Sequence, residues 1–202
     1  WAVLRARLNR LSPNGFALMA AGAVLEHGIT FDRLCAVSHL EEDEGLAALD
    51  ELISSRLLVE GAQPDAPGVY AFAHNMIREV VYTEAGDARR RLFHRRALDI
   101  LEASRVSPAV LAHHALAAGE EAAAFQRSLA AGHEALRLGA TGEAMMHLER
   151  ARQIAQDSAL PGAESEAQIR ELYLKLSQAY EQSGQHEQAR AVKEELAGLK
   201  RE

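Results

Sequence analysis

Residues 41–72, EEDEGLAALDELISSRLLVEGAQPDAPGVYAF, contain the change of pattern that decides the fold. The acidic run at 41–44 places negative charge where a helix N-terminus favours it, and leucines follow at helical spacing, so a helix is predicted to begin here. Two short β-prone runs, 57–60 and 69–72, then flank a stretch rich in Gly, Pro and Asp, which predicts a β-hairpin with a loose loop. The expected apolar face of the helix is Leu46, Leu49, Leu52 and Ile53.

Two further helices are predicted before this stretch. Ser12-Pro13 is a helix-start signal, because Ser caps free backbone N–H groups and Pro fits the first helical position. This helix is expected to run to about Glu26, and Thr30 or Asp32 is expected to cap a short second helix. Three small helices followed by a β-hairpin is the order of a winged-helix domain, which we expect at residues 11–105.

The rest of the chain is predicted to be helical. Two helices are expected at about 74–84 and 87–104, and Pro108 marks the next boundary. Beyond it, Gly119, Gly139 and Gly184 each lie five residues before an alanine that begins a helical run. This spacing is a weak internal repeat. We therefore expect a TPR-like array of helical hairpins at residues 107–202. Its packing positions are Gly132, Ala144, Leu148 and Ala151 in one hairpin and Leu176, Tyr180 and Ala189 in the last.

Composition agrees with a mainly α-helical class. The 202 residues include 39 alanines, 48% of them are hydrophobic, and Ala loses no side-chain entropy on entering a helix. Cys35 is the only cysteine, so no intramolecular disulfide can form and a reducing, cytoplasmic setting is expected. The formal charge of −7 lacks the basic balance of a nucleic-acid module, and no apolar run approaches the ~20 residues that span a bilayer.

The chain contains no Gly-Lys-Ser/Thr phosphate loop, so it is not a P-loop NTPase by itself. It begins at Trp1 without a methionine, and we expect it to be a piece of a longer protein.

A distinctive segment resembles a known family. Residues 70–82, YAFAHNMIREVVY, and 90–96, RRLFHRR, resemble the "F-x-H-x-x-I-R-E-x-x-Y … R-R-x-x-H-R" segment of bacterial STAND-type (AAA-related) signalling ATPases, which include LuxR- and SARP-type transcriptional regulators. Those proteins carry a P-loop NTPase domain, then a winged helix, then a TPR-like superhelix. An output module such as a DNA-binding domain, a cyclase or a kinase is attached at one end.

The resemblance implies what each part does. Residues 1–10 would be the linker from an ATPase domain that lies upstream, where ATP or ADP would bind; this chain itself would hold no cofactor. In related STAND proteins a histidine at the start of this segment contacts the phosphates of bound ADP and keeps the resting state closed, and His74 occupies that place. Asn75 stands where the usual pattern has Asp, which departs from the family.

Several charged side chains are candidate contacts between domains. Arg78 lies four residues after His74 and hence on the same helical face, beside Glu79, and we favour pairing of both within the winged helix over contact with the ATPase domain. The only basic patch would include Arg90 and Arg91, for which interdomain contact is open. A solvated face or interdomain ion pairs are favoured over DNA contact, because the acidic run at 41–44 would repel phosphates. The patch is Arg89, Arg90, Arg91, Arg95 and Arg96.

No catalytic or metal site is predicted. His113 and His114 are adjacent and point about 100° apart on a helix, without a further ligand at metal-binding spacing. Cys35 lies in an apolar setting and is interpreted as a buried small hydrophobe.

These features predict a non-catalytic regulatory region of a STAND-type regulator. The winged helix would hold the nucleotide switch closed, and the helical array would bind an effector protein or a small inducer. The expected partners are the upstream ATPase domain and that effector, with homo-oligomerisation left open and no direct contact with nucleic acid or membrane. Two alternatives stay open, a free-standing TPR-type interaction adaptor and a DNA-binding winged-helix regulator.

Overall fold

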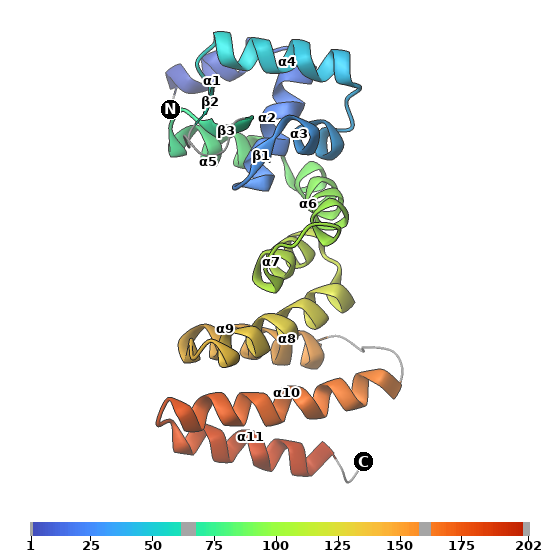
Figure 1. Cartoon of the computed structure of the whole chain (residues 1–202), viewed down its shortest axis with the longest axis vertical. Coiled ribbons are helices and arrows are strands. Elements are labelled where there is room, and N and C mark those ends of the chain that lie inside the picture. The colour runs from blue at the N-terminus through green and yellow to red at the C-terminus, as the bar shows by residue number, and fades with distance from the viewer. Residues whose placement is uncertain (1, 62–67, 158–162, 200–202) are drawn as a thin grey trace. The chain divides into compact units, whose positions relative to one another are not determined.

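The computed structural model describes residues 2–61, 68–157 and 163–199 (Figure 1). Among them the chain is mainly helical, with a small three-stranded sheet. It divides into two compact units, unit 1 at residues 1–104 and unit 2 at residues 105–202. Each unit has its own core and is described by itself. None of the described helices combines the length and apolarity that a membrane span requires.

Unit 1 begins with helices whose starts are set by local capping. The Ser12 side chain accepts a hydrogen bond from the Gly15 N–H at 2.9 Å, with Pro13 in the first turn. Glu51 in turn accepts from the Ser12 N–H at 2.9 Å and so anchors this start to a neighbouring helix. Thr30 caps the next helix through the Arg33 N–H, and Asp32 lies inside it. These helices are α1 (Ala2–Leu8), α2 (Pro13–Leu25), α3 (Phe31–Ser38) and α4 (Glu42–Ser54).

The N-terminal helix α1 is attached to unit 1. Leu8 is buried, Arg5 pairs with Glu84 at 2.6 Å, and Arg7 donates to the Ser55 carbonyl at 2.5 Å. The N-terminal segment at residues 1–10 is therefore largely helical and attached to unit 1. Their connection to an upstream ATPase domain stays a prediction.

The antiparallel strand pair of the predicted β-hairpin is confirmed, and a third strand joins it; the predicted loose loop falls largely on residues 62–67, which lie outside the described residues. Strands β2 (Leu58–Glu60) and β3 (Val69–Phe72) pair antiparallel with Leu58 opposite Phe72. The two-residue β1 (Ile29–Thr30) adds to the free edge of β3, with Ile29 opposite Tyr70, so the strand order is β1-β3-β2. Sequence analysis missed β1, because two residues are too short to show an alternating pattern.

Helices α5 (Asn75–Glu84) and α6 (Asp87–Glu102) complete unit 1. Helix α6 buries Phe93, Ala97 and Leu101 on one face, and Ile100 is half-buried. One expectation is wrong, since Leu46 in α4 is 52% exposed although Leu49 and Leu52 are buried. Helical spacing placed Leu46 on the apolar face, but it lies near the start of α4, where the flanking acidic residues are also exposed.

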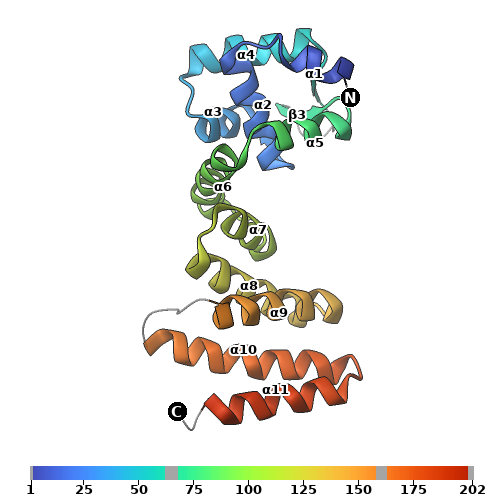
Figure 2. The ribbon, with the colours of Figure 1, turned by 180° about the vertical axis from the view of Figure 1, so that it is seen from behind.

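The described residues of unit 2 form five helices. Where the described chain turns between them, Gly119, Gly139 and Gly184 adopt positive φ angles of 78°, 74° and 77°, a conformation that favours glycine and ends a helix. Figure 2 shows α10 and α11 side by side as one such hairpin. The helices are α7 (Pro108–Ala118), α8 (Glu121–Arg137), α9 (Thr141–Asp157), α10 (Ala163–Gln182) and α11 (His186–Leu199).

Small residues let these helices approach closely. A Cβ atom added to Gly132 of α8 would lie 2.5 Å from Cγ of Leu148 in α9, so only glycine fits there. Ala144, Leu148 and Ala151 are completely buried, as the repeat register predicted. Of the last hairpin's predicted packing residues, Leu176 and Ala189 are buried, and Tyr180 packs against the core while partly exposed.

Candidate functional site

His74 lies at the junction between the sheet and α5. The chain leaves β3 through Ala73, whose N–H donates to the Leu57 carbonyl at 3.0 Å. His74 is the N-terminal cap residue of α5 by its backbone, which is extended, and its carbonyl accepts from the Ile77 N–H at 2.9 Å. The strand thus fixes where α5 begins and leaves the imidazole at the positive end of the helix.

The His74 side chain is exposed and makes no capping hydrogen bond. Nothing in the described part of the chain engages its imidazole nitrogens. The first-turn N–H groups of a helix favour an anion, and an imidazole N–H can donate to one. Met76, two residues further along the chain, is 57% exposed. The arrangement can therefore donate to an anionic group presented by another molecule or domain.

Arg78, by contrast, is engaged inside unit 1. Its Nη2 lies 3.4 Å from Oε1 of Glu26, the residue that ends α2 with a φ of 61°. This ion pair matches the favoured expectation of pairing within the winged helix. Glu79 differs from this expectation: its side chain is exposed and its carboxylate has no ion pair among the described residues, while its carbonyl accepts from the Thr83 hydroxyl at 2.9 Å. An interdomain contact of Glu79 stays a prediction.

Two arginines of α6 make contacts within unit 1 that the sequence did not predict. Arg96 donates to the Val37 carbonyl at 3.0 Å and thereby caps the end of α3. Arg90 pairs with Asp87 and lies over the Tyr82 ring, 5.0 Å from its centre. Arg96 thus departs from the expected solvated face, because its guanidinium reaches a carbonyl of another helix that a helical wheel does not reveal. An interdomain contact of Arg90 stays a prediction.

Two other arginines of α6, Arg89 and Arg91, have exposed side chains. Arg91 is exposed, as expected, and its interdomain role stays a prediction. Arg89 lies with its guanidinium 5.4 Å from the centre of the Phe16 ring.

The first turn of α4, where a recognition helix would meet DNA, carries exposed Glu42, Asp43 and Glu44. These carboxylates disfavour the approach of phosphates.

The histidine pair and the cysteine were considered as metal ligands and as a nucleophile, respectively. His114 is buried and His113 exposed, with their rings in edge contact. Within the residues that the structure describes, no three His, Cys, Asp or Glu side chains gather closely enough to hold a metal ion. Burial raises the pKa of the Cys35 thiol, and Asp32 and Glu42 raise it further, which disfavours the nucleophilic thiolate.

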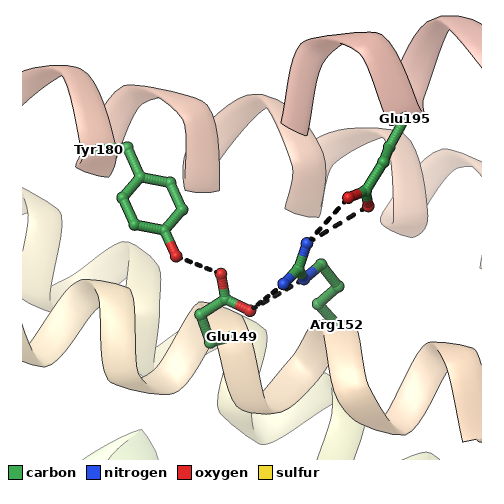
Figure 3. Close-up of polar contacts among 4 residues, drawn as sticks. All are labelled: Glu149, Arg152, Tyr180 and Glu195. Atoms are coloured by element: carbon green, nitrogen blue, oxygen red, sulfur yellow. Dashed lines mark hydrogen bonds and ion pairs between the residues drawn. The ribbon is translucent and has the colours of Figure 1, made fainter. Parts of the chain in front are cut away.

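In unit 2 a polar network that sequence analysis missed joins three helices (Figure 3). Arg152 of α9 contacts Glu149 through Nε at 2.9 Å and Glu195 of α11 through Nη1 at 3.2 Å. The Tyr180 hydroxyl of α10 donates to the other carboxylate oxygen of Glu149. The only local signal was the three-residue spacing of Glu149 and Arg152, which is common on exposed helices and gives no hint of Tyr180 or Glu195.

The electrostatics of this network favour a protonated Tyr180 and a charged Arg152. Burial raises the pKa of Tyr180 to about 12, with further contributions from the hydrogen bond to Glu149 and its charge, so the phenol keeps its proton. Burial would lower the pKa of Arg152, but the charges of Glu149 and Glu195 outweigh it and raise that pKa. The network carries one positive and two negative charges and holds the two C-terminal hairpins together.

Unit 2 also has a surface depression along α10, with a volume of about 510 Å³. Its lining combines charges of both signs with Leu174, which is 52% exposed. Beside it, Nε2 of His133 lies 3.5 Å from Oε1 of Glu171 and joins α8 to α10. Such a surface suits a partner with both charged and apolar groups. The described lining residues are Glu166, Ala167, Arg170, Glu171, Leu174, Lys175 and Gln178.

Comparisons with known proteins identify no relative. Searches against protein-family models, curated proteins and solved structures each return no match.

Proposed function

We propose that this chain is the non-catalytic regulatory region of a STAND-type signalling ATPase. In this proposal residues 11–105 form a winged-helix domain that holds the nucleotide switch closed, and residues 107–202 form a TPR-like array that binds an effector. The order of α2, α3 and α4 followed by the β2–β3 hairpin supports the first assignment. The close packing of Gly132 against Leu148 supports the second.

The observation that carries the proposal is the position of His74. Its imidazole is exposed at the positive end of α5, while the neighbouring Arg78 is engaged with Glu26. A histidine that used its side chain to cap its own helix would hold its ring against the first-turn N–H groups of that helix, whereas the His74 ring is not held in this way. In the closed state His74 would donate to a phosphate of ADP bound in the upstream domain, and loss of that contact would favour the open state.

The helical array would supply the input. The depression along α10 offers charged groups of both signs around Leu174, which supports recognition of a partner molecule rather than catalysis. An effector that binds the open state better than the closed state would shift the switch by its differential affinity.

The test is His74→Ala in the full-length protein. A charge-assisted hydrogen bond contributes about 1.5–3 kcal/mol, so ADP dissociation and basal output without effector should rise about 10- to 100-fold. The matched control is His186→Ala, since His186 is also an exposed histidine at the start of a helix. ADP release and reporter output are measured for both. If His74→Ala unfolds this 202-residue chain and leaves the basal output of the whole protein unchanged, His74 is structural and the proposal fails.

The isolated chain should bind neither ATP nor double-stranded DNA. It contains no phosphate loop, and the first turn of α4 is acidic. Calorimetry with ATP and a gel shift at about 150 mM salt check this expectation. Micromolar ATP binding contradicts the assignment of the nucleotide to another domain, and a persistent gel shift supports the DNA-binding alternative.

A further inference from the structure

Unit 1 contains a depression of about 610 Å³ that the proposed function does not use. It lies among α1, the start of α2, the end of α5 and the start of α6. Its walls combine guanidinium groups, an amide and apolar side chains. The lining residues are Arg5, Leu8, Asn9, Leu11, Ser12, Pro13, Phe16, Glu84 and Arg89.

The charge of this depression suits a monoanion. Arg5 is neutralised by Glu84, with Nη2 and Oε1 2.6 Å apart. Arg89 has no ion pair among the described residues, and its contact is with the ring of Phe16. The two arginines and one glutamate therefore leave one positive charge, and Arg89 carries it.

The contact with Phe16 prepares Arg89 to bind a carboxylate. Its Cζ lies 5.4 Å from the ring centre, and a guanidinium that lies over an aromatic ring keeps its N–H edge available. That planar edge matches the two oxygens of a carboxylate. The half-buried Phe16 also restricts the arginine side chain, so less conformational entropy is lost on binding.

The remaining wall is apolar on one side. Leu11 and Pro13 line the depression next to Phe16, and the exposed Asn9 adds an amide that can donate or accept. We infer that this depression is a binding site for a small carboxylate with an attached apolar chain, its carboxylate on Arg89 and its chain along Leu11 and Pro13.

This site is separate from His74. Glu84 lies at the C-terminal end of α5 and His74 precedes its N-terminal end, ten residues away, which corresponds to about 15 Å along a helix. The inference therefore does not depend on the proposed nucleotide switch, and His74→Ala should leave carboxylate binding unchanged.

The probe is hexanoate, titrated into the isotopically labelled chain and followed by NMR. We expect saturable shifts confined to the lining residues, with hexanamide and acetate each binding at least about tenfold more weakly because one lacks the charge and the other the apolar chain. Shifts without saturation, or equal binding of hexanamide, would overturn the inference.

Substitutions test the role of Arg89. Arg89→Gln should weaken hexanoate binding by about tenfold or more, and Arg89→Lys should restore it only in part, because a lysine keeps the charge but loses the planar fork. The matched control is Arg91→Gln, an exposed arginine of the same helix outside the depression. Amide spectra of each variant report whether unit 1 is folded. Equal weakening by Arg89→Gln and Arg91→Gln in folded chains would show a nonspecific charge effect and refute the site.

Discussion

The two units use their basic side chains differently. In unit 1 several arginines donate to backbone carbonyls where helices and loops end, as Arg7 does to Ser55, Arg33 to Gly28 and Arg96 to Val37. In unit 2 basic side chains pair with carboxylates across helices, as Arg152 does with Glu195 at 3.2 Å and Lys193 with Glu181 at 2.5 Å. Unit 1 contains ion pairs as well, such as those of Arg5 with Glu84 and Arg78 with Glu26.

The difference follows from how the helices end. The short helices of unit 1, such as the eight-residue α3, end in irregular connections that leave carbonyls for arginines to cap. The hairpins of unit 2 close through glycine turns, where the Gly119 N–H donates to Leu116 and the Glu120 N–H to Ala115, each at 3.0 Å. The side chains of unit 2 are then available to join one helix to another. Unit 2 should therefore depend more on close packing, salt and pH than unit 1.

The largest effect is expected at the closest helix contact of unit 2. Gly132→Ala would place a Cβ 2.5 Å from Cγ of the fully buried Leu148, and such overpacking costs about 1–3 kcal/mol of unfolding free energy. Gly142→Ala is the matched control, because a Cβ there meets no atom within 4 Å, and it should be neutral or stabilising by up to about 1 kcal/mol. Denaturant unfolding of both variants measures the difference. Equal stabilities would mean that α8 and α9 do not pack this tightly.

An intermediate effect should separate the two kinds of arginine contact. Arg152→Met leaves Glu149 and Glu195 without their shared cation and should cost about 1–2 kcal/mol at low salt, and less at high salt because screening weakens ion pairs. Arg96→Met removes a hydrogen bond to a carbonyl and should cost about 1 kcal/mol with little dependence on salt.

Unfolding of both variants at about 50 mM and 500 mM NaCl provides the measurement. Hydrogen exchange of amides in α3 and α9 assigns each loss to its own unit. If salt changed the loss of unfolding free energy equally in both variants, the proposed difference between the arginine contacts of the two units would be wrong.

The smallest effect concerns pH. Burial lowers the pKa of His133; Glu171 raises it in part, and Lys175 lowers it further. In the unfolded chain this histidine takes up a proton near its ordinary pKa of about 6.5, and in the folded chain it does so only at lower pH. The unfolded chain therefore binds more protons as the pH falls, which favours unfolding. The stability of unit 2 should therefore decrease as the pH falls through about 6.5.

Melting temperatures at about pH 7.5 and pH 5.5 test this expectation. His133→Gln should reduce the decrease without abolishing it, because burial and Arg150 also lower the pKa of His147 despite the opposing charge of Glu143. His186→Gln, at an exposed position, serves as the control. An unchanged pH dependence in His133→Gln would assign the effect to other groups.

Much of the fold could be predicted, because the decisive signals are local. Ser12-Pro13 and Thr30 begin helices by capping N–H groups three residues away, and Gly119, Gly139 and Gly184 end them through backbone conformations that glycine adopts easily. The burial of Ala144 and Leu148 was predicted from the weak internal repeat. For the candidate site, the sequence placed His74 at a helix start, but its free imidazole became visible only in the structure.

The contacts that only the tertiary structure revealed join residues that lie far apart in the sequence. Strand β1 exists because β3 offers an edge, and Arg96 reaches Val37 across 59 positions. Tyr180 meets Glu149 across 31 positions, and Arg152 meets Glu195 across 43. The sequence by itself determined where helices begin, turn and bury their small residues, since those preferences act within one or two turns. The side chains that face one another across helices were decided by packing, because spacing along one helix carries no information about the helix beside it.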